Sequence, residues 1–255
     1  MPVILITGAS SGIGASLARH YAAPDKTLIL VARDPARLDA VAAECRAKGA
    51  QVRSERLDVR DREAVGSRLR ALDAASPLDL AIVNAGVNGG HPDGALESEE
   101  TAFETVDINL TGALNVALPC VSLMSARGRG QIALVSSLAA FAPLPDAPAY
   151  SGTKAALLAH GLALRQKLRP LGVRVNVVAP GYVRTAMGGT YRGWRPLEMD
   201  ADEAARRIAR GLERDRGVIA FPAALALAAR GAGLVPEWLR LLGMSAFRFR
   251  IRQGH

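Results

Sequence analysis

Short apolar runs alternate along the chain with segments of helical periodicity. The runs are continuous rather than alternating, and they are rich in Val, Ile and Leu, which is typical of strands buried on both faces of a parallel sheet. The strands that we predict are 3–6, 27–31, 51–57, 78–83, 131–135, 173–178 and 218–221. The helices that we predict between them are 12–22, the segment from Asp34 to Gly49, 61–74, 98–126, 148–168 and 200–214.

Turn and cap residues support these boundaries. Asp34 and Pro35 are typical of a helix start, as a cap followed by proline at the first helical position. Gly49 and the Pro170-Leu171-Gly172 segment follow predicted helices, where glycine commonly ends them. The strict alternation of strand and helix predicts an α/β fold with helices on both faces of a parallel sheet. With no repeat and no linker, residues 1–255 form one predicted domain.

Composition narrows the function classes. The 255 residues are 49% hydrophobic and carry a net charge of +8, which raises nucleic acid as a partner. However, 28 of the 32 basic residues are Arg in an Ala-rich chain, and aromatic residues are only 4%, so bases have few stacking partners. We therefore expect no nucleic-acid binding. The four histidines are scattered, so we expect no metal site, and Cys45 and Cys120 are expected to be free thiols in a reducing compartment.

The chain carries no recognisable targeting or membrane segment. It begins with a short apolar run that lacks a charged segment and leads directly into Thr7-Gly8, so we interpret it as a first strand. The longest apolar run, 217–229, is interrupted by Pro222 and falls short of the ~20 residues of a membrane span. We expect a cytoplasmic protein.

Tyr150 and Lys154 are the first candidates for chemistry. Residues four apart lie on one face of a helix, where a nearby ammonium favours the phenolate and would lower the pKa of the phenol. With only four Tyr and four Lys in the chain, such a pair is rarely met by chance. The alternative is a surface aromatic ring covered by a lysine stem, and the spacing alone does not exclude it.

A glycine-rich turn joins the first predicted strand to the first predicted helix. Gly8, Gly12 and Gly14 would allow a tight turn and a close approach of the backbone to a pyrophosphate at the helix N-terminus. The spacing departs from the common dinucleotide-binding fingerprint. The stretch 8–12 also matches the GxSxG turn of α/β-hydrolases, but only seven residues precede Gly8, which leaves no room for the oxyanion loop of that fold.

Six motifs in order resemble the classical short-chain dehydrogenase/reductase family from residue 2 to about residue 187. They are Thr7-Gly8-x3-Gly12-x-Gly14, Leu57-Asp58-Val59, Asn84-Ala85-Gly86, Asp107-Ile108-Asn109-Leu110-Thr111-Gly112, Val135-Ser136-Ser137 with Tyr150-x3-Lys154, and Pro180-Gly181-Tyr182-Val183-Arg184-Thr185. The resemblance implies a Rossmann-type doubly wound sheet of about seven strands in the order 3-2-1-4-5-6-7. It also implies hydride transfer between a nicotinamide cofactor and a carbonyl or alcohol.

The same resemblance implies the roles of the site residues. Tyr150 would exchange the proton of the substrate oxygen, and Ser137 would hold that oxygen. Lys154 would lower the pKa of Tyr150 and bind the nicotinamide ribose, and Asn109 would hold a water for proton relay. The residues expected at the cofactor are Gly8, Ser10, Ser11, Gly12, Ile13, Gly14, Arg33, Asp58, Val59, Asn84, Ala85, Gly86, Tyr150, Lys154, Pro180, Gly181, Val183 and Thr185.

The end of the second strand indicates which cofactor is used. An NAD enzyme tends to place a carboxylate there for the ribose 2′-hydroxyl, whereas this chain has Ala32 followed by Arg33. A guanidinium can bind a 2′-phosphate with paired hydrogen bonds, and Asp34 is explained as a helix cap. Ser11 stands where many NADP-preferring relatives carry a basic residue, which argues the other way. We expect NADP(H) to be favoured over NAD(H).

Substrate and partners are less constrained. We expect a substrate pocket lined from 87–91, 138–144 and 182–197, the last of which includes Met187, Tyr191 and Trp194 and lies in a substrate-loop region 182–200. Its mostly apolar residues favour a hydrophobic carbonyl or secondary alcohol; a 3-oxoacyl thioester and a non-catalytic nucleotide-binding regulator are the alternatives. The family's usual end is replaced by a basic, apolar extension, 217–255. We therefore expect a homodimer rather than a tetramer, with membrane contact by this extension as a weaker alternative.

Overall fold

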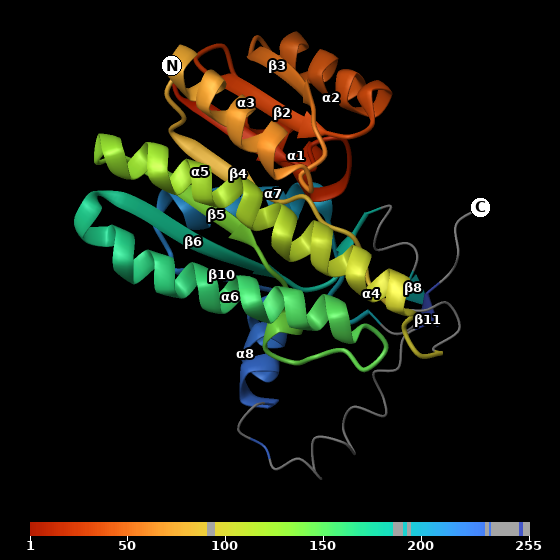
Figure 1. Cartoon of the computed structure of the whole chain (residues 1–255). Helices are drawn as coiled ribbons and strands as arrows, with labels where there is room; N and C mark the ends of the chain where they lie inside the picture. The colour runs from red at the N-terminus through yellow and green to blue at the C-terminus, as the bar shows by residue number, and fades with distance from the viewer. Residues whose placement is uncertain (91–94, 186–190, 193–194, 233–234, 236–249, 252–255) are drawn as a thin grey trace.

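Seven parallel strands form the centre of the protein. The computed structural model describes residues 1–90, 95–185, 191–192, 195–232, 235 and 250–251. The sheet has the strand order β10-β6-β5-β4-β1-β2-β3, and every neighbouring pair is parallel (Figure 1). Its strands are β1 (Val3–Thr7), β2 (Thr27–Ala32), β3 (Gln51–Arg56), β4 (Leu80–Val83), β5 (Gly130–Val135), β6 (Val173–Pro180) and β10 (Val218–Phe221). The predicted order is thus confirmed.

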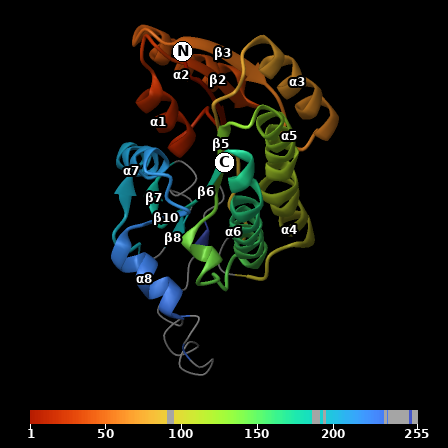
Figure 2. The ribbon, with the colours of Figure 1, turned by 90° about the vertical axis from the view of Figure 1, so that its left-hand side faces the viewer.

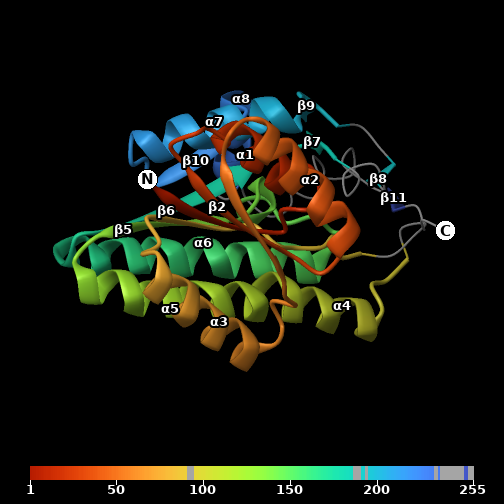
Figure 3. The same cartoon turned by 90° about the horizontal axis from the view of Figure 1, so that it is seen from above.

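Helices cover both faces of this sheet. Figures 2 and 3 show α1 and α7 on one side of the strands and α5 and α6 on the other. The helices are α1 (Gly12–Tyr21), α2 (Pro35–Ala47), α3 (Arg62–Ala75), α4 (Glu99–Val106), α5 (Gly112–Arg127), α6 (Pro148–Leu168), α7 (Ala201–Glu213) and α8 (Ala223–Ala232). The fold is therefore doubly wound, as the alternation of strands and helices predicted.

The core consists of two apolar layers, one on each face of the sheet. Successive strand residues point to opposite faces, so Leu30 packs in the layer under α1, α2 and α7, whereas Ile29 packs in the layer under α3, α5 and α6. Both side chains are fully buried, and each contributes about 1.5–3 kcal/mol relative to exposure. Burial on both faces explains why the strands are continuously apolar.

Local signals placed the helix ends correctly. The Asp34 side chain accepts a hydrogen bond from the Arg37 backbone N–H at 3.1 Å and so caps α2. Gly49 has a φ of +88°, the left-handed conformation that favours glycine after a helix. The predicted helix 98–126 differs in one respect, because a π-helical turn, η1 (Asp107–Thr111), separates α4 from α5.

Two short strand pairs include described residues of the predicted substrate-loop region 182–200. Here β7 (Val183–Arg184) pairs with β9 (Met199–Asp200), and β8 (Tyr191–Arg192) pairs with β11 (Arg250–Ile251). The apolar segment after Pro222 forms α8, which was not predicted as a helix. The segments 233–234, 236–249 and 252–255 of the predicted C-terminal extension lie outside the described residues.

One stretch of helix has the length and composition of a membrane span. It is the segment Glu99–Arg127, which the 20-residue criterion had not selected from the sequence. Half of its apolar window is buried inside the protein, where α5 packs against the sheet. Its buried residues face the neighbouring strands as in a core helix, whereas Phe103 and Leu118 of the same stretch are exposed.

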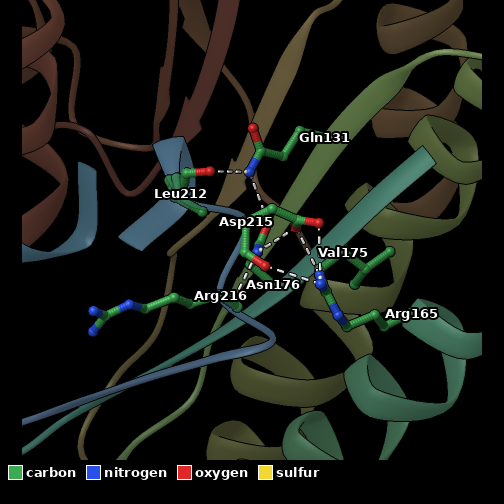
Figure 4. Close-up of polar contacts among 7 residues, drawn as sticks. All are labelled: Gln131, Arg165, Val175, Asn176, Leu212, Asp215 and Arg216. Carbon is green, nitrogen blue, oxygen red and sulfur yellow. Dashed lines mark hydrogen bonds and ion pairs between the residues drawn. The ribbon is translucent and has the colours of Figure 1, made fainter. Parts of the chain in front are cut away.

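A polar cluster fixes α6 to the sheet near the amino end of β5 (Figure 4). Arg165 of α6 donates hydrogen bonds to Asp215 at 2.7 and 3.0 Å and to the backbone of β6. Asn176, fully buried in β6, donates to Asp215 at 3.0 Å and accepts from Gln131 of β5 at 2.8 Å. The cluster therefore joins α6, β5, β6 and the turn before β10.

Candidate active site

The site lies at the carboxyl edge of the sheet, where β1, β4, β5 and β6 end. Because parallel strands end at the same edge, the segments that follow them meet there. The predicted glycine turn follows β1, the Asn84 triplet follows β4, the two serines follow β5, and Gly181 follows β6. Four motifs that are far apart in the sequence are thus brought together.

The glycine turn has the backbone that a phosphate site requires. Gly8 and Gly12 adopt positive φ values of +66° and +55°, which other residues rarely adopt. A Cβ at Gly14 would collide with the Gly8 carbonyl oxygen, so α1 packs closely under the turn. Ser11 is the N-cap residue of α1, but its side chain accepts no hydrogen bond from the first turn of the helix. Ser10 and Ile13 belong to the same turn. The first-turn N–H groups of α1 therefore lack a side-chain cap and suit a pyrophosphate.

The triplet after β4 holds the glycine turn in place. The Asn84 side chain donates a hydrogen bond to the Thr7 carbonyl at 3.0 Å. The Thr7 hydroxyl accepts from the backbone N–H groups of Asn84 and Ala85 at 3.0 and 3.1 Å. A Cβ at Gly86 would lie 3.0 Å from Asn109 Oδ1 and 3.5 Å from Lys154 Nζ. This triplet thus connects the cofactor end of the site to its catalytic end.

Asn109 is fully buried in the π-helical turn between α4 and α5. Its Oδ1 accepts a hydrogen bond from the Val87 N–H at 2.7 Å, and its Nδ2 donates to the Val87 carbonyl at 2.9 Å. Both the oxygen and the nitrogen of the Asn109 side-chain amide are therefore hydrogen-bonded to the backbone of Val87. A π turn inserts one extra residue into the helix, and such turns are frequent at functional sites.

The two serines after β5 have different tasks. Ser136 is buried, and its hydroxyl donates a 2.6 Å hydrogen bond to the Lys154 carbonyl, which ties β5 to α6. Ser137 instead hydrogen-bonds to the side chain of Tyr150. The Lys154 ammonium donates to the Val135 carbonyl at 3.0 Å and lies 5.5 Å from the centre of the Tyr150 ring. Ser137, Tyr150 and Lys154 thus form one cluster.

Burial has a larger effect on this cluster than the sequence suggested. The sequence led us to expect an ammonium that lowers the pKa of the phenol. In the structure, burial raises the pKa of Tyr150, and the hydrogen bond from Ser137 only partly opposes it. Burial also lowers the pKa of Lys154 from 10.5 to about 8. Both groups are pushed towards their neutral forms because the site excludes water.

The far end of the predicted cofactor site is charged. Arg33 is exposed after β2, and its charge contributes to lowering the pKa of Asp58, although the hydrogen bond from Arg60 contributes most. Arg60 binds Asp58 through its guanidinium at 2.6 Å. Val59 is buried, and its carbonyl accepts a 2.9 Å hydrogen bond from Asn115 Nδ2 in α5. The charge of Arg33 therefore acts on Asp58, whose carboxylate is paired with Arg60.

The segment after β6 approaches the glycine turn from the other side. A Cβ at Gly12 would lie 3.1 Å from Thr185 Cγ2, so these two segments are in contact. Pro180 ends β6, Gly181 donates a 2.8 Å hydrogen bond to the Phe221 carbonyl, and Val183 is buried. All the predicted catalytic and cofactor-binding residues lie within the described part of the chain.

Two features of the site were not found from the sequence. A Cβ at Gly181 would lie 3.1 Å from Leu225 of α8, so this helix borders the pocket side of the site. The Glu97 carboxylate contacts the segment after β4 and the start of α6. Both residues lie outside the motifs and far along the chain from Gly181 and Ala149, which they respectively contact, so the sequence carries no signal for either. Of the predicted pocket, His91, Met187, Trp194 and the Tyr191 side chain lie outside the described residues.

Comparison with known proteins identifies the family. A model of the family described as short chain dehydrogenase matches residues 2–196. An oxidoreductase from Myxococcus xanthus (strain DK1622) is 36% identical over 234 residues, which are 91% of this chain and 92% of that protein. The chain belongs to the short-chain dehydrogenase family, and it is an oxidoreductase of the NAD(P)-binding Rossmann type.

Solved structures agree in fold. A short-chain dehydrogenase from Sphingobium yanoikuyae in complex with NADPH is 32% identical, with a TM-score of 0.80, and the match covers 100% of this chain and 98% of that one. The bulky-bulky ketone specific alcohol dehydrogenase from Comamonas testosteroni is 29% identical, with a TM-score of 0.79, and the match covers 100% and 96%. The whole described fold, α8 included, is thus similar to that of solved dehydrogenases.

Proposed function

We propose that the protein is an NADP(H)-preferring reductase of hydrophobic ketones or aldehydes, with Tyr150 as its general acid. The observation that carries this proposal is the cluster of Ser137, Tyr150 and Lys154 beside Gly86 and Asn109. A phenol holds its proton at neutral pH and can donate it to a forming alkoxide when a nearby ammonium, here Lys154, stabilises the phenolate that remains. A regulator without catalysis would not need this cluster.

The bound cofactor would supply a hydride, and the residues of the chain would control the proton. Ser137 would hold the substrate oxygen next to the Tyr150 hydroxyl, because the two side chains already share a hydrogen bond. Lys154 would stabilise the phenolate that remains after proton transfer, since its amine lies over the Tyr150 ring and keeps most of its charge at neutral pH with a pKa of about 8. Asn109 would fix the backbone around Val87.

Arg33 is our reason for preferring NADP(H). Its guanidinium is exposed at the end of β2, and Asp34, the only carboxylate next to it in the chain, is engaged with Arg37 as the cap of α2. A 2′-phosphate would thus meet the positive charge of Arg33, while the two carboxylates nearby, Asp34 and Asp58, are engaged with Arg37 and Arg60. Solved relatives are described with either cofactor, NADPH for the one from Sphingobium yanoikuyae and NAD+ for a xylitol dehydrogenase that is 29% identical, so the proposal rests on Arg33.

A hydrophobic substrate is supported by the apolar surroundings of the site. Leu138 and Ala139 follow the serines, Leu225 borders Gly181, and Phe141 packs on the same apolar cluster. The similarity to an alcohol dehydrogenase specific for bulky ketones points the same way. An apolar ligand gains binding free energy when apolar side chains exclude water from it, whereas a small polar carbonyl compound would gain little.

We also propose a cytoplasmic homodimer. Phe103, Leu118 and Leu162 are 63%, 45% and 37% exposed on α4, α5 and α6. Helices α4 and α5 follow each other end to end, and α6 lies beside them (Figure 3). Apolar side chains on adjacent helices are typical of a subunit interface. The described free thiols, Cys45 and Cys120, are both buried, which suits a reducing compartment.

The test is oxidation of NADPH and of NADH in the presence of a carbonyl panel. The panel contains bulky aryl ketones, medium-chain aldehydes and a 3-oxoacyl thioester. We expect turnover of the apolar carbonyls with a clear preference for NADPH, and Arg33→Ala should weaken NADPH binding about tenfold or more while it leaves NADH binding unchanged. Tyr150→Phe should bind NADPH normally without turnover. Tight NADPH binding with no turnover of any carbonyl would favour a regulator.

A further inference from the structure

The Glu97 carboxylate joins two segments on either side of Tyr150. One oxygen, Oε1, accepts a hydrogen bond from the Gly90 N–H at 2.6 Å. The other, Oε2, accepts from the Ala149 N–H at 3.0 Å. Gly90 lies on the segment that follows β4, and Ala149 is the residue before Tyr150 in the first turn of α6. One half-buried side chain therefore connects the wall of the site with the start of the helix that carries the acid.

Helix α6 needs such a partner because its own N-cap does not supply one. The N-cap is Ala147, which makes no side-chain cap, and Pro148 has no N–H to donate. The Ala149 N–H is the first free donor of this 21-residue helix, and a carboxylate is the acceptor that its positive end favours. Glu97 thus caps α6 from outside the helix, 52 residues away in the chain.

The segment 87–90 is fixed at both of its ends. Asn109 binds both backbone groups of Val87, and Glu97 binds the N–H of Gly90. Between these ends, a Cβ at Gly89 would lie 2.5 Å from Glu97 Oε1 and 3.3 Å from Tyr150 Cβ. Gly89 is therefore enclosed between the carboxylate and the base of the Tyr150 side chain, and a shift of the segment would be transmitted directly to Tyr150.

We propose that Glu97 is a positioning residue, which sets the location of Tyr150 relative to the substrate wall 87–90 without touching the reacting atoms. This inference rests on the function proposed above. The carboxylate of Glu97 is essential to this role, because it can accept a hydrogen bond on each of its two oxygens at once. A glutamine in its place would turn an NH2 group towards one of the two N–H donors, so that only one of the two hydrogen bonds could be kept.

The main experiment compares Glu97→Gln with Glu99→Gln in steady-state kinetics with NADPH and the best carbonyl of the panel. Glu99 lies in the first turn of α4 and is exposed, so this control makes the same change of charge nearby without touching the site. We expect kcat of Glu97→Gln to fall about tenfold or more, because small misplacements of reacting groups cost rate. The dissociation constant for NADPH should change less than twofold in both variants, and the control should keep its kcat.

A second variant and a measurement on the unaltered protein keep the proposal testable if Glu97→Gln folds poorly. Gly89→Ala leaves Glu97 charged but places a methyl group against its carboxylate, and we expect it to reproduce the loss of kcat. In the wild-type protein, hydrogen exchange should show the Gly90 and Ala149 amides protected. Rapid exchange at both amides, or full kcat in Glu97→Gln, would overturn the proposal. A wild-type protein that reduces no carbonyl would instead refute the proposed function, while the exchange measurement would still test the Glu97 bridge.

Discussion

The buried ammonium of Lys154 should destabilise the cofactor-free fold. The residue is 5% exposed, and burial lowers its pKa from 10.5 to about 8. Each tenfold change in a proton-binding constant corresponds to about 1.4 kcal/mol, so keeping this group protonated in the fold costs on the order of 3 kcal/mol. Lys154→Met removes the charge and keeps an unbranched side chain of similar length. It also removes the hydrogen bond to Val135, which is worth about 1 kcal/mol.

The expected result is a net stabilisation of about 1–3 kcal/mol at pH 7, together with loss of turnover. The pH dependence provides the sharper test. Because the pKa is lower in the folded than in the unfolded state, the unfolded state binds more protons between pH 8 and 10.5. The stability of the wild-type protein should therefore gain a contribution as pH rises through this window, and Lys154→Met should lack it.

Urea unfolding of the cofactor-free proteins at pH 7 and pH 10 measures both effects. Lys167→Met is the matched control, because Lys167 lies on the same helix but is exposed. The difference in unfolding free energy between wild type and Lys154→Met should shrink from pH 7 to pH 10, whereas the control should differ little from wild type at either pH. If Lys154→Met were less stable than wild type at pH 7, the reasoning would be refuted.

Two further predictions concern α6. Gly152→Ala should raise the unfolding free energy by about 1 kcal/mol, since a Cβ there meets nothing within 4 Å and alanine favours a helix. A lower unfolding free energy in urea titration would contradict this and show that this face is covered by another subunit. Arg165→Met should cost about 2–3 kcal/mol at pH 7 through loss of charge-assisted hydrogen bonds. Arg165 lowers the pKa of Asp215, so this contribution exists above the ordinary carboxyl pKa and is lost as pH falls through the lowered one. The unfolding free energy of Arg165→Met should therefore depend less on pH in the acid range than that of the wild type. An unchanged pH profile would contradict this prediction.

Residues whose role depends on local chain geometry could be predicted from the sequence. The cap at Asp34 and the left-handed Gly49 follow from rules about single turns, and both were placed correctly. The strand order followed from the resemblance to a known family. The π turn at Asp107–Thr111 could not be predicted, because its residues have ordinary helical periodicity and the extra residue is accommodated by contacts from Asn109 to a distant segment.

The electrostatic properties of the site were harder to predict than the residues that form it. The spacing of Tyr150 and Lys154 predicts their proximity, but it contains no information about how much water surrounds them. In the structure, desolvation has the largest effect on both pKa values, and it reverses the direction expected for Tyr150. Burial depends on the packing of β5 and α6 against each other, which no single segment of the sequence describes.

Helix α6 carries a buried charge between two fixed ends. Lys154, in the second turn of the helix, favours conformations that let water reach its amine. At its C-terminal half, Arg165 binds Asp215 and the backbone of β6. At its first turn, Glu97 accepts from Ala149. Because α6 is fixed at both ends, it cannot tilt to bring water to Lys154 without breaking charge-assisted hydrogen bonds. The fold can therefore hold Lys154 beside Tyr150 despite the free-energy cost of burying its charge.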